Sequence, residues 1–201
     1  MAMDRHEKAL KVVRAAGLMR PRDLATAGIP AWVLYDLVKK GAVKQAGHGL
    51  YSVCGHSPTE HHSYAGVLKR IPQGTLCLLS ALRFHELTVQ NPPEVWIAIP
   101  KEAWRPRPAD VQLRVFRFSG QALTSGVETH RVEGVPVRVT NVARTIADCF
   151  KYRNKIGMDV ALEALHEGWR KKRFGMDELW RYAKLDRVTN VIMPYLETLP
   201  S

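Results

Sequence analysis

Residues 30–53 read PAWVLYDLVKKGAVKQAGHGLYSV, in which a helical pattern gives way to a hairpin pattern. Placed on a helix at about 100° per residue, the first part of this stretch has two distinct faces. One face is aliphatic and consists of Val33, Leu34, Leu37 and Val38. The opposite face consists of Trp32, Tyr35, Asp36 and Lys39. The stretch therefore predicts a helix, begun by Pro30, with one face that packs and one that stays free.

The second part of the stretch has the composition of a tight β-hairpin. β-Branched and aromatic residues stand on both sides of Gly47, His48 and Gly49. The two glycines supply the positive φ angles that a short hairpin turn requires. We therefore expect a two-stranded hairpin after Gly41.

Two further helical patterns precede this stretch. Apolar or small residues recur at helical spacing between positions 5 and 16, and Gly17 follows as a stop signal. Pro21 suits the first position of a second, short helix that Gly28 ends. Three helices followed by a hairpin predict a winged helix-turn-helix over residues 1–56.

A winged helix-turn-helix places its third helix in the major groove of DNA and its hairpin near the phosphates. The predicted groove contacts are therefore Trp32, Tyr35 and Lys39. The formal net charge of +11 supports this interpretation, because residues 1–56 hold nine lysines and arginines against four acidic residues. The alternative is a packing or protein-docking module, in which Trp32 and Tyr35 lie against a second domain.

The composition bounds the class of protein. A chain of 201 residues that is 46% hydrophobic is long enough for two small domains with ordinary cores. The sequence has no apolar run of membrane-spanning length and no signal-peptide pattern, so we expect a cytoplasmic protein without a membrane partner.

The cysteines do not predict disulfides, because Cys54, Cys77 and Cys149 are odd in number and widely separated. Cys54 also belongs to a short cluster with three histidines, which are His56, His61 and His62. The cluster lacks the paired C-x-x-C element that makes a zinc prediction specific. We therefore expect neither a metal nor another cofactor.

The remainder of the chain predicts an α+β arrangement. Residues 57–74 are expected to hold a connecting helix that starts near Thr59, a potential N-cap, and ends near Arg70. Residues 75–201 are expected to form a second domain, in which a small, mostly antiparallel sheet packs with helices. Its first helix is predicted over residues 75–87. The strand-like runs that follow are residues 95–99, 113–118, 127–132 and 135–139, the last two joined by a turn at Glu133 and Gly134.

Helical patterns end the chain. Asn141 is a suitable N-cap for the first of them, in which Arg144 and Asp148 are four residues apart and are expected to pair along the helix surface. The later helices are predicted over residues 158–172, 177–185 and 188–199, the last kinked by Pro194.

The sequence offers little for an enzyme. His85 and Glu86 begin like the zinc-protease motif H-E-x-x-H, but Val89 stands where the second histidine is required. A P-loop and a G-x-S-x-G elbow are both absent. We expect no enzymatic activity; a nuclease or transferase, with Asp148 and Glu163 converging in space, is the alternative.

Four stretches carry a resemblance to a known family: residues 16–53 (AGLMRPRDLATAGIPAWVLYDLVKKGAVKQAGHGLYSV), 78–88 (LLSALRFHELT), 92–100 (PPEVWIAIP) and 134–157 (GVPVRVTNVARTIADCFKYRNKIG). With these stretches the chain resembles the AbiEi family, the antitoxins and transcriptional regulators of type IV toxin–antitoxin (abortive infection) systems. The resemblance covers nearly the whole chain.

The resemblance implies a protein with two roles. Its winged helix would bind inverted repeats in the promoter of its own operon and repress transcription. Its C-terminal domain, residues 75–201, would counter a nucleotidyltransferase-like toxin, with or without a direct complex. The alternative within the same fold is a stand-alone winged-helix regulator that has no toxin partner.

Related hairpins often carry arginine where this chain has Gln45 and His48. We therefore expect phosphate anchoring to rely less on the hairpin tip, where His48 is the predicted contact, and more on nearby cations. These cations are Arg20, Arg22, Lys40 and Lys44.

Overall fold

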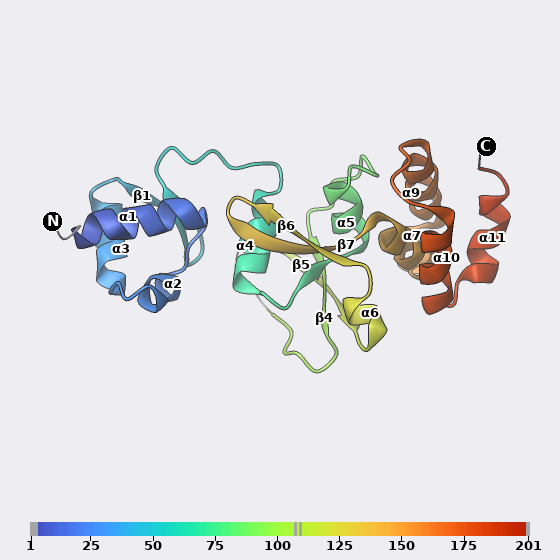
Figure 1. Ribbon diagram of the computed structural model, residues 1–201, viewed down its shortest axis with the longest axis horizontal. Coiled ribbons are helices and arrows are strands. Elements are labelled where there is room, and N and C mark those ends of the chain that lie inside the picture. The colour runs from blue at the N-terminus through green and yellow to red at the C-terminus, as the bar shows by residue number, and fades with distance from the viewer. Residues whose placement is uncertain (1–3, 107, 109, 200–201) are drawn as a thin grey trace. The chain divides into compact units, whose positions relative to one another are not determined.

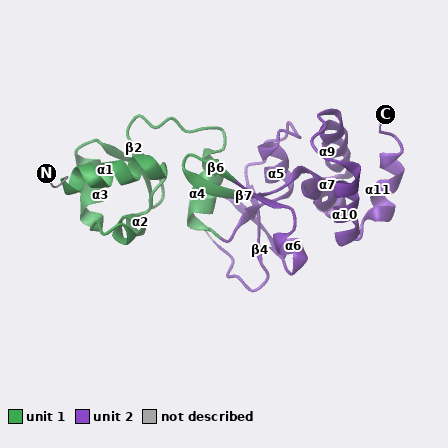
Figure 2. Cartoon of the chain, viewed as in Figure 1, with its two compact units in different colours: residues 1–72, 108–111, 130–137 green, residues 73–107, 112–129, 138–201 purple. Residues whose placement is uncertain are grey.

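The computed structural model describes residues 4–106, 108 and 110–199 (Figure 1). The chain divides into two compact units (Figure 2). Unit 1 consists of residues 1–72, 108–111 and 130–137, and unit 2 consists of residues 73–107, 112–129 and 138–201. None of the helices in the described ranges is long and apolar enough to cross a membrane.

Unit 1 begins with three helices and a hairpin. Its helices and strands are α1 (Arg5–Ala16), α2 (Pro21–Thr26), α3 (Ala31–Lys39), β1 (Val43–Gly47), β2 (Leu50–Val53) and α4 (His62–Arg70). The first three helices enclose one apolar core, to which α1 contributes Ala9 and Val13, and α2 contributes Leu24. Gly17 and Gly28 follow α1 and α2 with φ angles of 68° and 71°. The predicted helices and their glycine stops are therefore confirmed.

The hairpin is confirmed as well, and a third segment of the chain forms a short backbone pairing with it. β1 and β2 pair antiparallel, and Gly49 has a φ of 67° in the turn. Met19, in the segment between α1 and α2, pairs with Tyr51 of β2. The amide of Met19 donates to the Tyr51 carbonyl at 2.9 Å, and the amide of Tyr51 donates back at 2.8 Å. These hydrogen bonds tie the hairpin to the start of α2.

The connecting helix starts later than its sequence predicts. Helix α4 begins at His62, and Thr59 does not cap it. The hydroxyl and the amide of Thr59 donate instead to Oε1 of Glu133, at 2.8 and 2.7 Å. A carboxylate from seventy-four residues away therefore fixes Thr59, which lies two residues before His61, the N-cap of α4.

The sheet is mixed rather than mostly antiparallel, so that prediction was wrong. Its strands are β3 (Thr75–Leu76), β4 (Val95–Pro100), β5 (Leu113–Phe118), β6 (Val127–Val132) and β7 (Val135–Thr140), in the spatial order β5-β4-β3-β7-β6. β3 pairs antiparallel with β4, whereas the pairs β3–β7 and β4–β5 are parallel. The boundary between the units passes through β6 and β7, so the turn between them belongs to unit 1.

One cause of the error is the central strand β3. Its two residues, Thr75 and Leu76, were assigned by their apolar pattern to the helix that follows. A two-residue strand is too short for a period of two to be visible in the sequence. Because β3 lies between β4 and β7, this assignment hid the parallel pair β3–β7; the parallel pair β4–β5 does not involve β3 and was missed separately.

The helices of unit 2 pack around α7. They are α5 (Leu78–Phe84), α6 (Gln121–Thr124), α7 (Val142–Lys151), α8 (Arg153–Ile156), α9 (Met158–Arg170), α10 (Met176–Leu185) and α11 (Thr189–Leu196). α7 contacts α5, α9 and α10, and its residues from Val142 to Phe150 are all buried. Asn141 caps α7 as predicted, because its side-chain oxygen accepts a hydrogen bond from the Arg144 amide at 2.9 Å.

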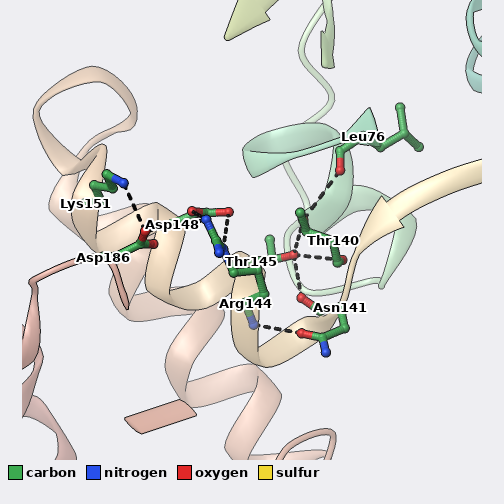
Figure 3. A network of polar contacts seen from close by, with 8 residues as sticks. All are labelled: Leu76, Thr140, Asn141, Arg144, Thr145, Asp148, Lys151 and Asp186. Carbon is green, nitrogen blue, oxygen red and sulfur yellow. Dashed lines mark hydrogen bonds and ion pairs between the residues drawn. The ribbon is translucent and has the colours of Figure 1, made fainter. Parts of the chain in front are cut away.

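Arg144 and Asp148 do pair, but inside the core rather than on the helix surface (Figure 3). Both side chains are fully buried, and the guanidinium donates to both carboxylate oxygens at 3.1 and 2.9 Å. Asp186, also buried, lies 3.5 Å from Arg144 and accepts a hydrogen bond of 2.9 Å from Lys151. The error arose because the helical spacing of a pair does not reveal that neighbouring helices cover it.

Gly17 has a second role, which predicts a measurable cost of substitution. A Cβ at this position would lie 1.7 Å from the carbonyl oxygen of Glu133, in the turn between β6 and β7. Gly28 has a similar φ, but nothing lies within 4 Å of its Cβ position. Gly28→Ala should therefore cost about 1 kcal/mol of left-handed backbone strain. Gly17→Ala should cost a further 1–3 kcal/mol, roughly, from overpacking.

Urea unfolding of the two glycine variants measures this difference. Both variants add one methyl group at a glycine of positive φ. At Gly17 the approach of the Glu133 backbone adds to the strain of a φ of 68° combined with a ψ of −75°. Equal losses of stability would mean that the turn between β6 and β7 does not lie against the end of α1.

Candidate nucleic-acid interface

The two faces of α3 differ in exposure as predicted. Trp32 is 53% exposed and Tyr35 is 48% exposed, while Lys39 is also exposed. The aliphatic side is buried at Val33, Leu34 and Leu37, and Val38 is partly buried. The helix therefore presents two large aromatic side chains and one cation to solvent, although burial of the aromatic groups would be favourable.

Neighbouring rings support the two exposed aromatic side chains at their edges. The ring of His6, from α1, meets Trp32 in a T-shaped contact with centroids 6.0 Å apart. Nε2 of His6 also lies 2.7 Å from Oδ2 of Asp36, which holds the imidazole against α3. Tyr35 meets Tyr51 of the hairpin in a second T-shaped contact at 6.2 Å. Contacts of this kind restrict the orientations of the two aromatic side chains on the outward face of α3.

Most of the predicted phosphate contacts are accessible. Arg22 is exposed. Lys40 is also exposed, with its Nζ 2.9 Å from Oδ2 of Asp36. Lys44 donates from its Nζ to the His56 carbonyl at 3.3 Å. Surface pairs of this kind contribute little free energy, so these cations can exchange their partners for phosphate at small cost.

Arg20 differs from the other cations, because its guanidinium is bound to Asp23. Nε and Nη2 of Arg20 donate to Oδ1 of Asp23 at 3.1 and 2.8 Å, and both side chains are 19% exposed. Lys69 of α4 lies 3.1 Å from the same carboxylate. Burial opposes ionisation of Asp23, but its hydrogen bonds with Arg20 and Lys69 outweigh burial and lower the pKa to about 2. Arg20 is therefore the least available of the predicted contacts.

An acidic side chain lies at the tip of the hairpin. The amide of His48 donates to Oδ2 of Asp110 at 3.0 Å, while the His48 residue itself is exposed. Arg70 holds Asp110 with two further hydrogen bonds of 2.7 and 2.8 Å. The sequence contains no local signal for this contact, because Asp110 lies sixty-two residues from His48. The His48 amide therefore donates its hydrogen bond to a carboxylate, and the tip does not offer it to a phosphate.

The cysteine and histidine cluster separates in the structure. Cys54 is exposed, whereas His56 and His62 converge on Glu133 of the turn between β6 and β7. The ring of His61 stacks on Tyr64 instead. The sequence cluster alone did not indicate this grouping, because the carboxylate lies far along the chain.

The residues weighed for catalysis in unit 2 have structural contacts. His85 is buried, and its Nε2 lies 2.7 Å from the Thr140 carbonyl oxygen. Asp148 is bound to Arg144 within the core. A separate pocket of about 860 Å³ lies over α6 and α10, lined by residues that include Ser125, Trp180 and Arg181.

Comparisons with known proteins do not assign a family. No protein-family model matches the chain, and a search of curated proteins finds no significant relative. We therefore interpret the outward face of α3 from its own exposure, charge and contacts.

Proposed function

We propose that residues 5–53 form a winged helix-turn-helix that binds duplex DNA, and that the protein is a cytoplasmic, non-enzymatic transcriptional autorepressor. One observation carries the proposal above the others. A nine-residue helix, α3, keeps Trp32 and Tyr35 about half exposed while the aliphatic residues behind them are sealed in the core. This division is what a recognition helix needs, because its inner face docks and its outer face meets base edges.

The chemistry of the outward face suits a major groove. Lys39 can donate to the O6 and N7 acceptors of guanine, and the aromatic rings can contact thymine methyl groups. The hairpin β1–β2, tied to Met19 through Tyr51, corresponds to the wing. The positive charge of residues 1–56 adds a salt-dependent attraction to the phosphates.

Asp110 refines where the phosphates are held. Its carboxylate is paired with Arg70 and accepts from the His48 amide, so the tip does not offer that amide to a phosphate. The pKa of Asp110 is lowered because its hydrogen bonds from Arg70 and His48 outweigh partial burial. We therefore assign phosphate anchoring to the cations near α3, which are Arg22, Lys40 and Lys44, ahead of the tip at His48. This assignment agrees with the sequence, which lacks arginine at positions 45 and 48.

The AbiEi-like stretches extend the proposal to a second role. We propose that the protein is the antitoxin of a type IV toxin–antitoxin system and opposes a nucleotidyltransferase-like toxin. The stretches that carry the resemblance in unit 2 form its framework, since residues 92–100 include β4 and residues 134–157 include β7 and α7. Two copies of the chain on an inverted repeat would match the symmetry of such an operator.

The DNA proposal is tested by titrating a promoter duplex with the full chain between about 50 and 200 mM salt. Fluorescence anisotropy should show tighter binding than to a scrambled duplex. Lys40→Ala combined with Lys44→Ala should reduce the slope of log K against log salt by about one unit per lost contact. Lys184→Ala, an exposed cation of unit 2, is the matched control. An unchanged slope in the double variant would show that Lys40 and Lys44 do not contact the phosphates.

The second role is tested separately in cells. The full chain carrying Trp32→Ala and Tyr35→Ala should lose repression of its promoter but still protect cells that express the neighbouring gene. Loss of protection would assign both roles to the same surface. If no nucleotidyltransferase-like gene lies beside this one, the stand-alone regulator is the better interpretation.

A further inference from the structure

Three side chains from distant parts of the sequence meet in unit 1. Nε2 of His56, which follows β2, lies 2.9 Å from Oε2 of Glu133. Nδ1 of His62, the first residue of α4, lies 2.7 Å from the same oxygen. These three donor atoms all lie within 4.8 Å of one another. The two imidazole nitrogens therefore both lie at hydrogen-bonding distance from one carboxylate oxygen, and the three atoms form a compact group of potential metal ligands.

Thr59 orients the carboxylate. Its amide and hydroxyl both donate to Oε1 of Glu133, at 2.7 and 2.8 Å. Oε1 is thereby occupied, and Oε2 alone faces the two histidines. Metal-binding carboxylates and imidazoles are commonly fixed in this way by outer hydrogen bonds, which set the ligand orientation before the ion arrives.

The backbone at Glu133 is also unusual. Its φ is 48°, in the left-handed region, where turns favour glycine, asparagine or aspartate. A glutamate at this position accepts backbone strain, and strain of this kind is concentrated at functional sites.

The exposure of the three side chains leaves room for one more ligand. The Glu133 side chain is only 2% exposed, whereas the His56 and His62 side chains are 21% and 30% exposed. The carboxylate is thus enclosed, while the imidazoles border solvent. Three protein ligands with one open side fit an ion that completes its coordination with water.

We propose that His56, His62 and Glu133 form a binding site for a divalent transition-metal ion, with Zn²⁺ the best match to this ligand set. Zn²⁺ binds imidazole nitrogen and carboxylate oxygen at about 2.0–2.2 Å in a tetrahedral arrangement. Ligand atoms of such a tetrahedron lie about 3.3–3.6 Å apart, so Oε2 has to move away from each nitrogen by roughly 0.4–0.9 Å to admit the ion. The ion would link the segment between β2 and α4 to the turn between β6 and β7.

The site shares no side chain with the proposed DNA contacts, although the His56 carbonyl accepts a hydrogen bond from Lys44. Its test therefore measures metal binding alone, on the untagged, full-length chain stripped of metal. Calorimetric titration with ZnCl₂ should give one ion per chain. Titration with CoCl₂ should give the visible absorption of a low-coordinate site with nitrogen and oxygen ligands. Thermal unfolding should shift upward by about 4 °C or more when Zn²⁺ is in large excess over its Kd.

Three ligand variants and two neighbouring controls locate the site. His56→Ala, His62→Ala and Glu133→Gln should each weaken Zn²⁺ binding by at least about tenfold. Glu133→Gln keeps the size of the side chain, and its metal-free unfolding curve checks that the fold persists. His61→Ala and Cys54→Ser should leave the affinity unchanged.

Several results would overturn the proposal. One is the absence of stoichiometric Zn²⁺ binding by the wild-type chain in the micromolar range. Others are undiminished binding by both His62→Ala and Glu133→Gln, or loss of binding in Cys54→Ser, which would indicate a different ligand set. A wild-type chain that fails to bind leaves the three side chains as a hydrogen-bonded cluster alone.

Discussion

Trp32→Ala combined with Tyr35→Ala should lower the affinity of the full chain for its promoter duplex by about 100-fold. Each well-placed contact to a base contributes roughly 1–3 kcal/mol, so two such contacts account for a loss of this size. The free energy of unfolding should change little, because both side chains are about half exposed. Fluorescence anisotropy measures the first quantity, and urea unfolding measures the second.

Trp104 offers a matched control for this experiment. It is 94% exposed and belongs to unit 2, in the loop after β4. Trp104→Ala removes an equally large aromatic side chain without touching α3, and DNA affinity should be retained. If Trp104→Ala weakens binding while the α3 double variant binds normally, then α3 does not read DNA and its aromatic face serves another partner.

Arg144→Met should destabilise the protein by about 3–5 kcal/mol, the cost of leaving a buried charge without its partner. Figure 3 shows the side chains of Arg144, Asp148 and Asp186 close together. The Arg144 guanidinium lies 2.9 Å from Asp148 and 3.5 Å from Asp186, and all three side chains are 0% exposed. The substitution leaves Asp148 without this cation, although Lys151 still reaches Asp186. The free energy of unfolding of small domains is only about 5–15 kcal/mol, so the expected loss is a large fraction of it.

Two further variants separate the charge from the packing. Arg144→Met combined with Asp148→Leu should recover much of the loss, since removing both partners of a buried pair is often close to neutral. Arg170→Met, which breaks an exposed pair with Glu167, should have little effect on stability. The free energies of unfolding of the three variants, measured with urea, separate the contribution of the charge from that of packing. A loss below about 1 kcal/mol for Arg144→Met alone would show that water reaches the network.

Local patterns predicted the first three helices and the hairpin of unit 1 well. The bounds of α1 are those expected from its apolar spacing and from Gly17. The residues that end a helix lie in its last turn or directly after it, so they can be recognised from the local sequence. The two faces of α3 also followed from spacing alone, since an isolated helix already separates its side chains by angle. Asn141 capped α7 for the same reason, through a hydrogen bond three residues away.

The errors share one feature, which is a partner from far along the chain. Thr59 was expected to cap α4, but a distant carboxylate takes its hydrogen bonds. Arg144 and Asp148 were expected on a surface, but other helices cover them. Residues 75 and 76 were expected in a helix, but pairing on both sides makes them a strand. Propensity and spacing carry no information about such partners.

The sequence by itself determined the first three helices, the glycines that follow α1 and α2 and which face of α3 is apolar, because these properties depend on neighbours within about one helical turn. Only the tertiary structure decided that Asp110 lies at the hairpin tip and that Glu133 meets His56 and His62. Contacts of this kind join residues that are far apart in the sequence, so they depend on how the chain folds in three dimensions. Their energy comes from burial and orientation of charges that no local pattern specifies.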